Sequence, residues 1–255
     1  MPPRIAIPVP HSVDLEYAER AIPQYEHAVT LAGGEAVRIP LDHTPAEVKK
    51  MIERCDGVLL PGSKADIDPV RFHAPRSPHT AAADPRRDAV DDLLLDAAYA
   101  RRLPVLGICY GLQSLNVFHA GSLIQHIPDF LPEAARAKVD HEAGKNVAVA
   151  HTVEIEPDSK LAGIVAPDGR GPGSGSQRAL VVPVNSSHHQ SAEAIGTGLR
   201  IVARCPDDGI IEALEGTSPD HFVIAVQWHP ERSIDHDEPS RAIFRALIEA
   251  ARQCG

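Results

Sequence analysis

Pro104-Val105-Leu106-Gly107-Ile108-Cys109-Tyr110-Gly111-Leu112-Gln113 carries the strongest structural signal in the chain. Its first half, residues 104–108, is a short apolar run typical of a buried strand. Residues 112–119 that follow are expected to form a helix. A cysteine between two glycines at such a junction has the G-x-nucleophile-x-G form of a nucleophile elbow. The abrupt turn strains the central residue and exposes its side chain, and small neighbours let chain and substrate approach closely.

Upstream of this junction, predicted strands and helices alternate. The expected strands are residues 4–9, 37–39 and 57–60. The expected helices begin at Pro23, at Pro45 and after Asp84, with Pro23 in a first helical turn. This alternation favours a parallel sheet covered on both faces. Residues 61–84 form a long loop, and loops of that length in compact domains are usually functional or disordered.

The second half of the chain is richer in strands. Candidates are residues 148–155, 180–184, 199–203, 210–214 and 222–226, before a final helix from about 239 to 251. Residues 171–176 are expected to be a flexible surface loop. We therefore predict one α/β domain over residues 1–255. Its central sheet is doubly wound and mostly parallel, with helices on both faces and a small antiparallel extension.

Composition excludes several classes of protein. The net charge of -10, with no Lys/Arg cluster, argues against a nucleic-acid partner. No apolar run is long enough to span a membrane, and the N-terminus lacks the zones of a signal peptide. We therefore expect a cytoplasmic protein whose four cysteines are reduced. The sequence leaves the oligomeric state open, with a homo-oligomer among the alternatives.

Cys109 is the candidate nucleophile. At a helix N-terminus, the backbone dipole and free N–H groups favour the thiolate over the thiol. The N–H of Tyr110 can also help to hold an oxyanion. The alternative is a structural cysteine that falls between two glycines by chance.

His229 and Glu231 are candidate partners for this thiol, which needs a base that is itself oriented by a third group. They stand in Gln227-Trp228-His229-Pro230-Glu231. Pro230 biases His229 toward extended geometry, in which residues two apart project to the same side. Glu231 can then fix the tautomer of the imidazole. A solvated His-Pro-Glu turn is the competing interpretation.

With these residues the sequence resembles the class I glutamine amidotransferase superfamily, and within it the stand-alone γ-glutamyl-γ-aminobutyrate hydrolase branch. The resemblance runs in order over nearly the whole chain. Its motifs are residues 60–63, 66–69, 84–88, 104–113, 115–117, 121–123, 184–190 and 227–231. It implies a flavodoxin-like sheet with the nucleophile at the carboxyl end of a central strand.

The resemblance also implies roles for individual residues. Cys109, His229 and Glu231 would form a catalytic triad, and backbone N–H groups of Gly62, Ser63 and Tyr110 would form the oxyanion hole. Substrate contacts would come from Gln113, Asn185, Ser186, His188 and His189. No metal or organic cofactor is implied.

Two departures from the family pattern stand out. Tyr110 occupies a position that is commonly Arg in this branch, which could alter recognition of the leaving group while sparing the backbone donor. The family's Pro-Gly-Gly turn is Pro61-Gly62-Ser63 here, which is tolerable only if Ser63 keeps a negative φ.

Other conspicuous residues have more than one interpretation. A metal held by His188 and His189 with His229 and Glu231 is disfavoured, because neighbouring residues in a strand point oppositely and the spacing makes no closed ligand set. Asp66 and Asp68 are expected to stabilise a turn rather than to recognise a substrate amine.

The expected substrate is a small molecule with a γ-glutamyl amide, hydrolysed to glutamate and an amine through a γ-glutamyl thioester. A glutaminase that supplies ammonia to a partner synthase is the main rival, and a non-catalytic binding protein on the same fold is a second. The identity of the leaving amine does not follow from the sequence.

Overall fold

A nine-stranded sheet runs through the computed structural model, which describes residues 1–144, 147–166 and 179–254. One half is parallel and contains, in spatial order, β2 (Glu35–Ile39), β1 (Arg4–Pro8), β3 (Gly57–Leu60), β4 (Val105–Ile108) and β11 (Val223–Val226). The other half continues from β11 with antiparallel pairings through β10 (Ile211–Gly216), β9 (Leu199–Arg204), β6 (His151–Ile155) and β7 (Leu180–Val184). The antiparallel extension is thus part of the same sheet.

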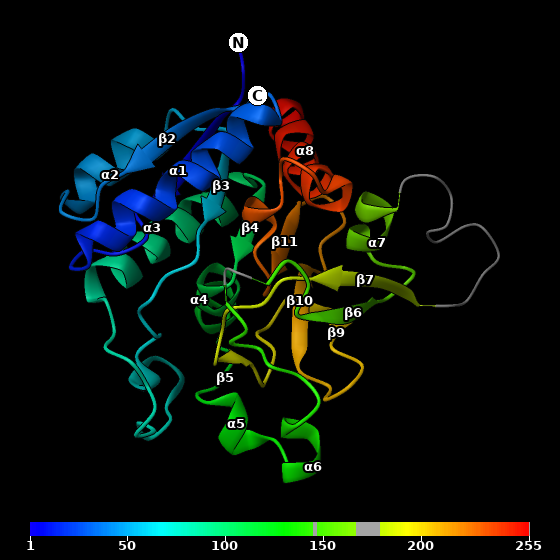
Figure 1. The fold of residues 1–255 in the computed structure, drawn as a ribbon. Helices are drawn as coiled ribbons and strands as arrows, with labels where there is room; N and C mark the ends of the chain where they lie inside the picture. Colours follow the sequence, from blue (N-terminus) through cyan, green and yellow to red (C-terminus); the bar gives the residue numbers. More distant parts are fainter. Residues whose placement is uncertain (145–146, 167–178, 255) are drawn as a thin grey trace.

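Helices cover both faces of the sheet, as predicted (Figure 1). Apolar side chains of one face pack with α1 (Leu15–Leu31), α7 (Lys160–Val165) and α8 (Glu238–Gln253). Those of the other face pack with α2 (Pro45–Ile52), α3 (Pro85–Arg101) and α4 (Tyr110–Phe118). The inner strands of the parallel half, β1, β3, β4 and β11, therefore lie between two apolar layers, which explains their nearly continuous apolar sequences. The predicted doubly wound α/β fold is confirmed.

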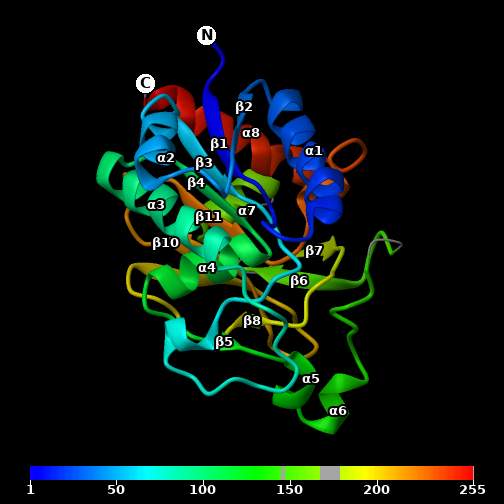
Figure 2. The ribbon, with the colours of Figure 1, turned by 90° about the vertical axis from the view of Figure 1, so that its left-hand side faces the viewer.

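Short elements gather at the end of the molecule away from the chain termini (Figures 1 and 2). They are a two-stranded antiparallel sheet of β5 (Leu123–Ile124) and β8 (Ser191–Ala192), with α5 (Ile127–Phe130) and α6 (Glu133–Arg136). The sequence did not predict these elements or α7, because segments this short show too little periodicity. The loop predicted at residues 171–176 lies outside the described residues.

The start of α1 corrects one prediction. The helix begins at Leu15, capped by Asp14, whose carboxylate accepts the Tyr17 N–H, and Pro23 lies inside it rather than in its first turn. A proline costs a helix one hydrogen bond. Here the buried apolar face of α1, which includes Tyr17, Ile22 and Tyr25, packs on the sheet and outweighs that loss. The helix therefore begins at Leu15 rather than at Pro23.

Within the described part of the chain, no helix is both long enough and apolar enough to cross a bilayer.

The turn from β4 into α4 depends on two glycines. A Cβ on Gly111 would lie 2.1 Å from the carbonyl oxygen of Leu60 on β3. A Cβ on Gly107 would lie 2.8 Å from the carbonyl oxygen of Gly111. Only glycine allows β3, β4 and α4 to approach this closely. The sequence pattern Gly-x-Cys-x-Gly thus has a steric origin on both sides of the cysteine.

A buried arginine holds the long loop that follows β3. The guanidinium of Arg87 on α3, with none of its side chain exposed, donates to the carbonyl oxygens of Pro61 at 2.7 Å and Pro10 at 3.2 Å. Its charge pairs with Asp91, whose Oδ1 lies 2.7 Å from Nε. Asp84 caps α3 and also accepts hydrogen bonds from Ser12. The helix that was predicted to begin after Asp84 is confirmed.

Replacing Gly111 with alanine should destabilise the fold. The added methyl group would collide with the Leu60 backbone, which cannot move without distorting the sheet. Overpacking of this kind costs about 1–3 kcal/mol or more of unfolding free energy. Urea denaturation followed by circular dichroism measures the change.

Gly163→Ala is the matched control, since a Cβ there would meet nothing within 4 Å in helix α7. That variant should be neutral or more stable by up to about 1 kcal/mol. Equal stability of the two variants would contradict the steric account of the elbow.

Candidate functional site

Cys109 occupies the predicted elbow. Its φ of 54° and ψ of -106° lie outside the regions that side chains ordinarily adopt. The strain is held in place by backbone hydrogen bonds: the Cys109 N–H donates to Val226 on β11, and its carbonyl accepts from Leu112 and Gln113 on α4. The sulfur-bearing side chain borders a cavity of about 250 Å³ beyond the carboxyl ends of β4 and β11. Ligands of doubly wound sheets bind at this edge.

His229 follows β11 and faces the same cavity. Its Nδ1 lies 2.7 Å from Oε1 of Glu231, and because a carboxylate only accepts, Nδ1 carries the proton. Both side chains are buried. Burial alone would raise the pKa of Glu231, but the attraction and hydrogen bond of His229 lower it below its usual value. Glu231 is therefore a charged group that orients the imidazole.

Asn185 fixes the backbone of His229 from the neighbouring chain segment. Its amide nitrogen donates to the His229 carbonyl and its amide oxygen accepts the His229 N–H, both at 2.9 Å. The sequence predicted a substrate contact for Asn185. In the structure the pair of hydrogen bonds uses the amide to hold His229, and the side chain does not border the cavity of Cys109.

The turn after β3 brings the two candidate catalytic side chains together. A Cβ on Gly62 would lie 3.0 Å from Cε1 of His229 and 3.6 Å from Cβ of Cys109. Both side chains thus converge on one point across Gly62. Residues far apart in the sequence therefore form a single polar site at the sheet edge.

The protonation state of Cys109 differs from the sequence-based prediction. Burial raises the pKa of the thiol to about 12, and this effect outweighs Arg232 and the N–H of Tyr110, which lower it. The helix N-terminus alone had suggested a thiolate. With 6% of Cys109 exposed, the cost of removing a charge from water prevails. Burial thus favours the neutral thiol of Cys109, from which attack on a substrate requires a base to take the proton.

The predicted oxyanion hole is only partly available. The N–H of Tyr110 lies at Cys109, and Ser63 borders the cavity. The N–H of Gly62, which was also predicted to hold the oxyanion, donates to the hydroxyl of Tyr25 at 3.0 Å. Ser63 is not among the described residues with positive φ, so the Pro-Gly-Ser turn meets the condition set from the sequence.

Gln113 and His189, two of the predicted substrate contacts, border the cavity. Gln113 Nε2 donates to the Gln190 carbonyl at 3.1 Å, and His189 Nε2 lies 3.1 Å from a carboxylate oxygen of Asp66. Ser186, another predicted substrate contact, does not border it: its hydroxyl is buried and donates to the His141 carbonyl.

The acidic pair in the long loop divides its roles. Asp68 caps a short 3-10 helix, η1 (Pro69–Phe72), through the N–H of Val70, as predicted. Asp66 stabilises the loop by accepting from Ala81, but it also faces the cavity.

His188 does not combine with His189, His229 and Glu231. Its Nε2 points at Glu212, 3.5 Å from Oε1, while His189 pairs with Asp66. His188 and His189 therefore face different carboxylates, His188 toward Glu212 and His189 toward Asp66.

Tyr110 directs its hydroxyl away from solvent. The hydroxyl donates to Asp88 at 2.5 Å, and the Arg87 guanidinium lies 4.8 Å from the ring centroid. Although Tyr110 borders the cavity, its side chain is 1% exposed. Its polar group is thus used to tie α4 to α3.

Sequence reasoning missed several residues that line the cavity. They are Tyr17 and Arg20 of α1, Lys64, Glu142, Ser187 and Arg232. Tyr17 and Arg20 were missed because α1 was predicted to begin only at Pro23. Arg232 stands directly after the His-Pro-Glu motif, with Nε 3.7 Å from Glu231, and the motif's position could have revealed it. Three cations therefore stand around a site expected to bind a carboxylate-bearing group.

Comparison with known proteins identifies a family and several relatives of this chain. The model of the family described as Peptidase C26 matches residues 8–231. A Mycobacterium tuberculosis protein named "Putative glutamine amidotransferase Rv2859c" is 36% identical over 230 residues, covering 89% of this chain and 66% of that protein, just under two thirds of its length. The γ-glutamyl-γ-aminobutyrate hydrolase PuuD of Escherichia coli is 31% identical over 234 residues, covering 90% and 85%. A chain in the structure of PurLQS from Thermotoga maritima has a TM-score of 0.59 at 16% identity, covering 98% and 99%, and shares the fold.

The buried thiol of Cys109 should react slowly with iodoacetamide at neutral pH. Because its pKa is raised to about 12, the rate should keep increasing beyond pH 9. Peptide mass spectrometry after timed alkylation resolves the site, and the exposed Cys254 supplies an internal reference for reagent reactivity. A rate for Cys109 that levels off below pH 8 would show a thiolate in the free protein.

Proposed function

The chain belongs to the Peptidase C26 family, and from that membership we propose that it hydrolyses γ-glutamyl amides with Cys109 as nucleophile. The supporting observation is the strained Cys109 elbow, which shares one cavity with His229, itself hydrogen-bonded to Glu231. Family membership supports a hydrolase, and the relatives named γ-glutamyl-γ-aminobutyrate hydrolase suggest the γ-glutamyl class of substrate.

In the first half of the reaction, the Cys109 sulfur attacks the γ-carbonyl carbon of the substrate. His229 takes the thiol proton as the C–S bond forms, and the carbonyl electron pair moves onto oxygen. The N–H groups of Tyr110 and Ser63 stabilise this oxyanion. The tetrahedral intermediate then collapses: the C–N bond breaks, and His229 returns its proton to the departing amine.

In the second half, water hydrolyses the γ-glutamyl thioester. His229 removes a proton from the water as it attacks the carbonyl carbon. The C–S bond then breaks and the sulfur regains its proton, releasing glutamate. Glu231 stabilises the positive charge that His229 carries in both halves of the reaction. Asn185 holds the backbone of His229 in place.

The charges around the cavity suit a substrate with carboxylates. Arg20, Lys64 and Arg232 supply positive charge, while Asp66 and Glu142 can pair with an α-ammonium group. Lys64 is held by Asp14 at 2.9 Å and lies over the Tyr17 ring. A cavity lined by charges of both signs suits the α-carboxylate and α-ammonium groups of a glutamyl substrate better than it suits an uncharged amide.

A glutaminase is the second candidate, favoured by the relative from Mycobacterium tuberculosis that is named for amidotransferase activity. The decisive experiment compares glutamine with a series of γ-glutamyl amines, γ-glutamyl-γ-aminobutyrate among them, as sole substrates. We expect kcat/KM for at least one γ-glutamyl amine to exceed that for glutamine. Preference for glutamine would favour the glutaminase instead.

Cys109→Ala should abolish turnover of every active substrate in that series while the protein stays folded. The reason is that no other thiol borders the cavity among the described residues. Cys254→Ala, which removes an exposed thiol, is the matched control and should retain full activity. Undiminished turnover by folded Cys109→Ala would eliminate the proposed mechanism.

Glu231→Gln should reduce kcat by roughly 10²- to 10⁴-fold with little change in KM, as for carboxylates that orient a catalytic histidine. The amide keeps the shape but neither charges nor firmly orients His229. Glu238→Gln, an exposed change on α8, should leave both constants unchanged. A Glu231 variant that changes only KM would assign Glu231 to substrate binding.

A further inference from the structure

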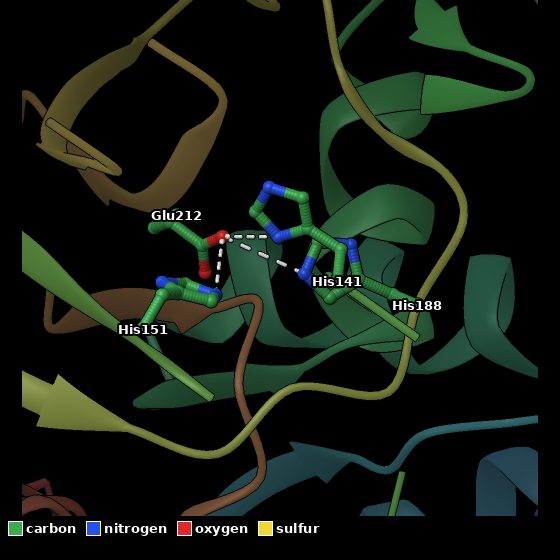
Figure 3. Close-up of side chains that lie close together, drawn as sticks. All are labelled: His141, His151, His188 and Glu212. Atoms are coloured by element: carbon green, nitrogen blue, oxygen red, sulfur yellow. Dashed lines mark ion pairs between the residues drawn. The ribbon is translucent and has the colours of Figure 1, made fainter. Parts of the chain in front are cut away.

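A second polar cluster lies behind the wall of the cavity. His141, His151, His188 and Glu212 are all buried, and the Glu212 side chain has no exposed surface. One potential ligand atom from each lies within 4.8 Å of the others. Figure 3 shows three imidazoles arranged around one carboxylate oxygen. From this arrangement we propose that the cluster binds a divalent transition-metal ion of the zinc class in a closed four-ligand site.

The separations agree with coordination of one ion. Oε1 of Glu212 lies 3.4 Å from His141 Nδ1, 3.5 Å from His151 Nε2 and 3.5 Å from His188 Nε2. Ligand atoms at the corners of a tetrahedron with zinc–ligand bonds of about 2.0–2.1 Å are roughly 3.3–3.4 Å apart. The three distances from Oε1 exceed an ordinary hydrogen bond and are close to this tetrahedral edge, and the three nitrogens lie within 4.8 Å of one another.

The outer hydrogen bonds give each imidazole the tautomer that a metal needs. His188 Nδ1 lies 2.9 Å from the Gln190 carbonyl, and His151 Nδ1 lies 3.1 Å from the Thr152 carbonyl. Carbonyl oxygens only accept, so in both rings the proton is on Nδ1 and Nε2 presents a lone pair to the centre. Metal-bound histidines in proteins are held by the same kind of outer partner.

His141 completes this pattern with its nitrogens reversed. Its Nε2 lies 2.8 Å from a carboxylate oxygen of Asp208, which leaves the Nδ1 lone pair facing Glu212. Three lone pairs and a carboxylate therefore converge on one buried point. None of the three facing nitrogens, and neither oxygen of Glu212, has a hydrogen-bond partner. A cation at the centre would satisfy all of them at once.

A proton is the alternative cation. Burial alone would lower the pKa of His141, but its pairing with Asp208 and Glu212 raises it to about 9. Burial alone would raise the pKa of Glu212, but pairing with His141 and His188 lowers it to about 2. The cluster is thus built to hold positive charge. One proton satisfies one imidazole only, whereas a metal ion satisfies all three.

The four ligands come from separate parts of the chain. His151 opens β6 and Glu212 lies on β10, while His141 and His188 lie in the loops before β6 and after β7. With four protein ligands no position remains open for water, so the ion would be structural rather than catalytic. His188 also borders the cavity of Cys109, so the ion would fix that wall.

Metal content of the untagged protein tests the proposal. Purified without chelator, the protein should contain about one zinc-class ion per chain by plasma mass spectrometry. After removal of the ion, it should rebind one equivalent of Zn²⁺. Co²⁺ in its place should give the visible absorption typical of tetrahedral cobalt. Folded wild-type protein that binds no Zn²⁺ in this titration would overturn the proposal and assign the cluster to a bound proton.

Variants locate the ion. Glu212→Gln and His151→Gln should each weaken Zn²⁺ binding at least about 100-fold, and Asp208→Asn about 10- to 100-fold, as for other outer partners. Zn²⁺ should raise the Tm of the wild type but not of Glu212→Gln. Circular dichroism confirms that each variant is folded.

The control is His126→Ala, because His79, His126 and Asp129 form another group with metal-like spacing but lie at the surface. Cys109→Ala excludes the active-site thiol as a ligand. Both should keep full stoichiometry. Unchanged binding in Glu212→Gln and His151→Gln, or loss in either control, would place the ion elsewhere and refute the assignment. None of these readouts depends on whether γ-glutamyl amides are hydrolysed.

Discussion

Helix α4 packs against β3 so closely that no side chain fits at Gly111, and the geometry of the site depends on this contact. The chain leaves β4 and must enter α4 within one residue, so Cys109 adopts a positive φ. The sulfur is thereby directed at the carboxyl edge of the sheet. The same approach places the β3 turn, with Gly62 and Ser63, beside the cysteine.

Buried charged and polar side chains with hydrogen-bond partners stabilise this strained edge of the sheet. Arg87 binds the carbonyl of Pro61 next to the turn, and its charge is balanced by Asp91. On the opposite side, Asn185 holds His229 through two hydrogen bonds. A buried charge without such partners would be expensive. The reactive groups therefore rest on buried, hydrogen-bonded supports.

Much of this could be predicted from the sequence. The parallel half of the sheet, the elbow, and the proximity of His229 and Glu231 follow from local patterns, because strand periodicity and the Gly-x-Cys-x-Gly spacing act over short distances. The state of the Cys109 thiol could not be predicted, since burial is a property of the assembled fold. The hydrogen bonds of Asn185 to His229 and of Ser186 to His141 could not be predicted either, because sequence reveals the polarity of a side chain but not its direction. The partners of His188 were hidden for the same reason: His141, His151 and Glu212 are distant along the chain.

The change of strand direction between β11 and β10 has a consequence for how such sites can be assembled. In a purely parallel sheet, only the carboxyl ends of the strands lie at the edge where ligands bind. Because β10 runs against β11, it enters the sheet at that edge, and the Glu212 carbonyl there accepts the Gln227 N–H just before His229. The fold can therefore place strand entrances as well as strand exits around one cavity. Side chains on the entering strand can vary without touching the elbow, which gives this architecture a second, independent route for acquiring new chemistry.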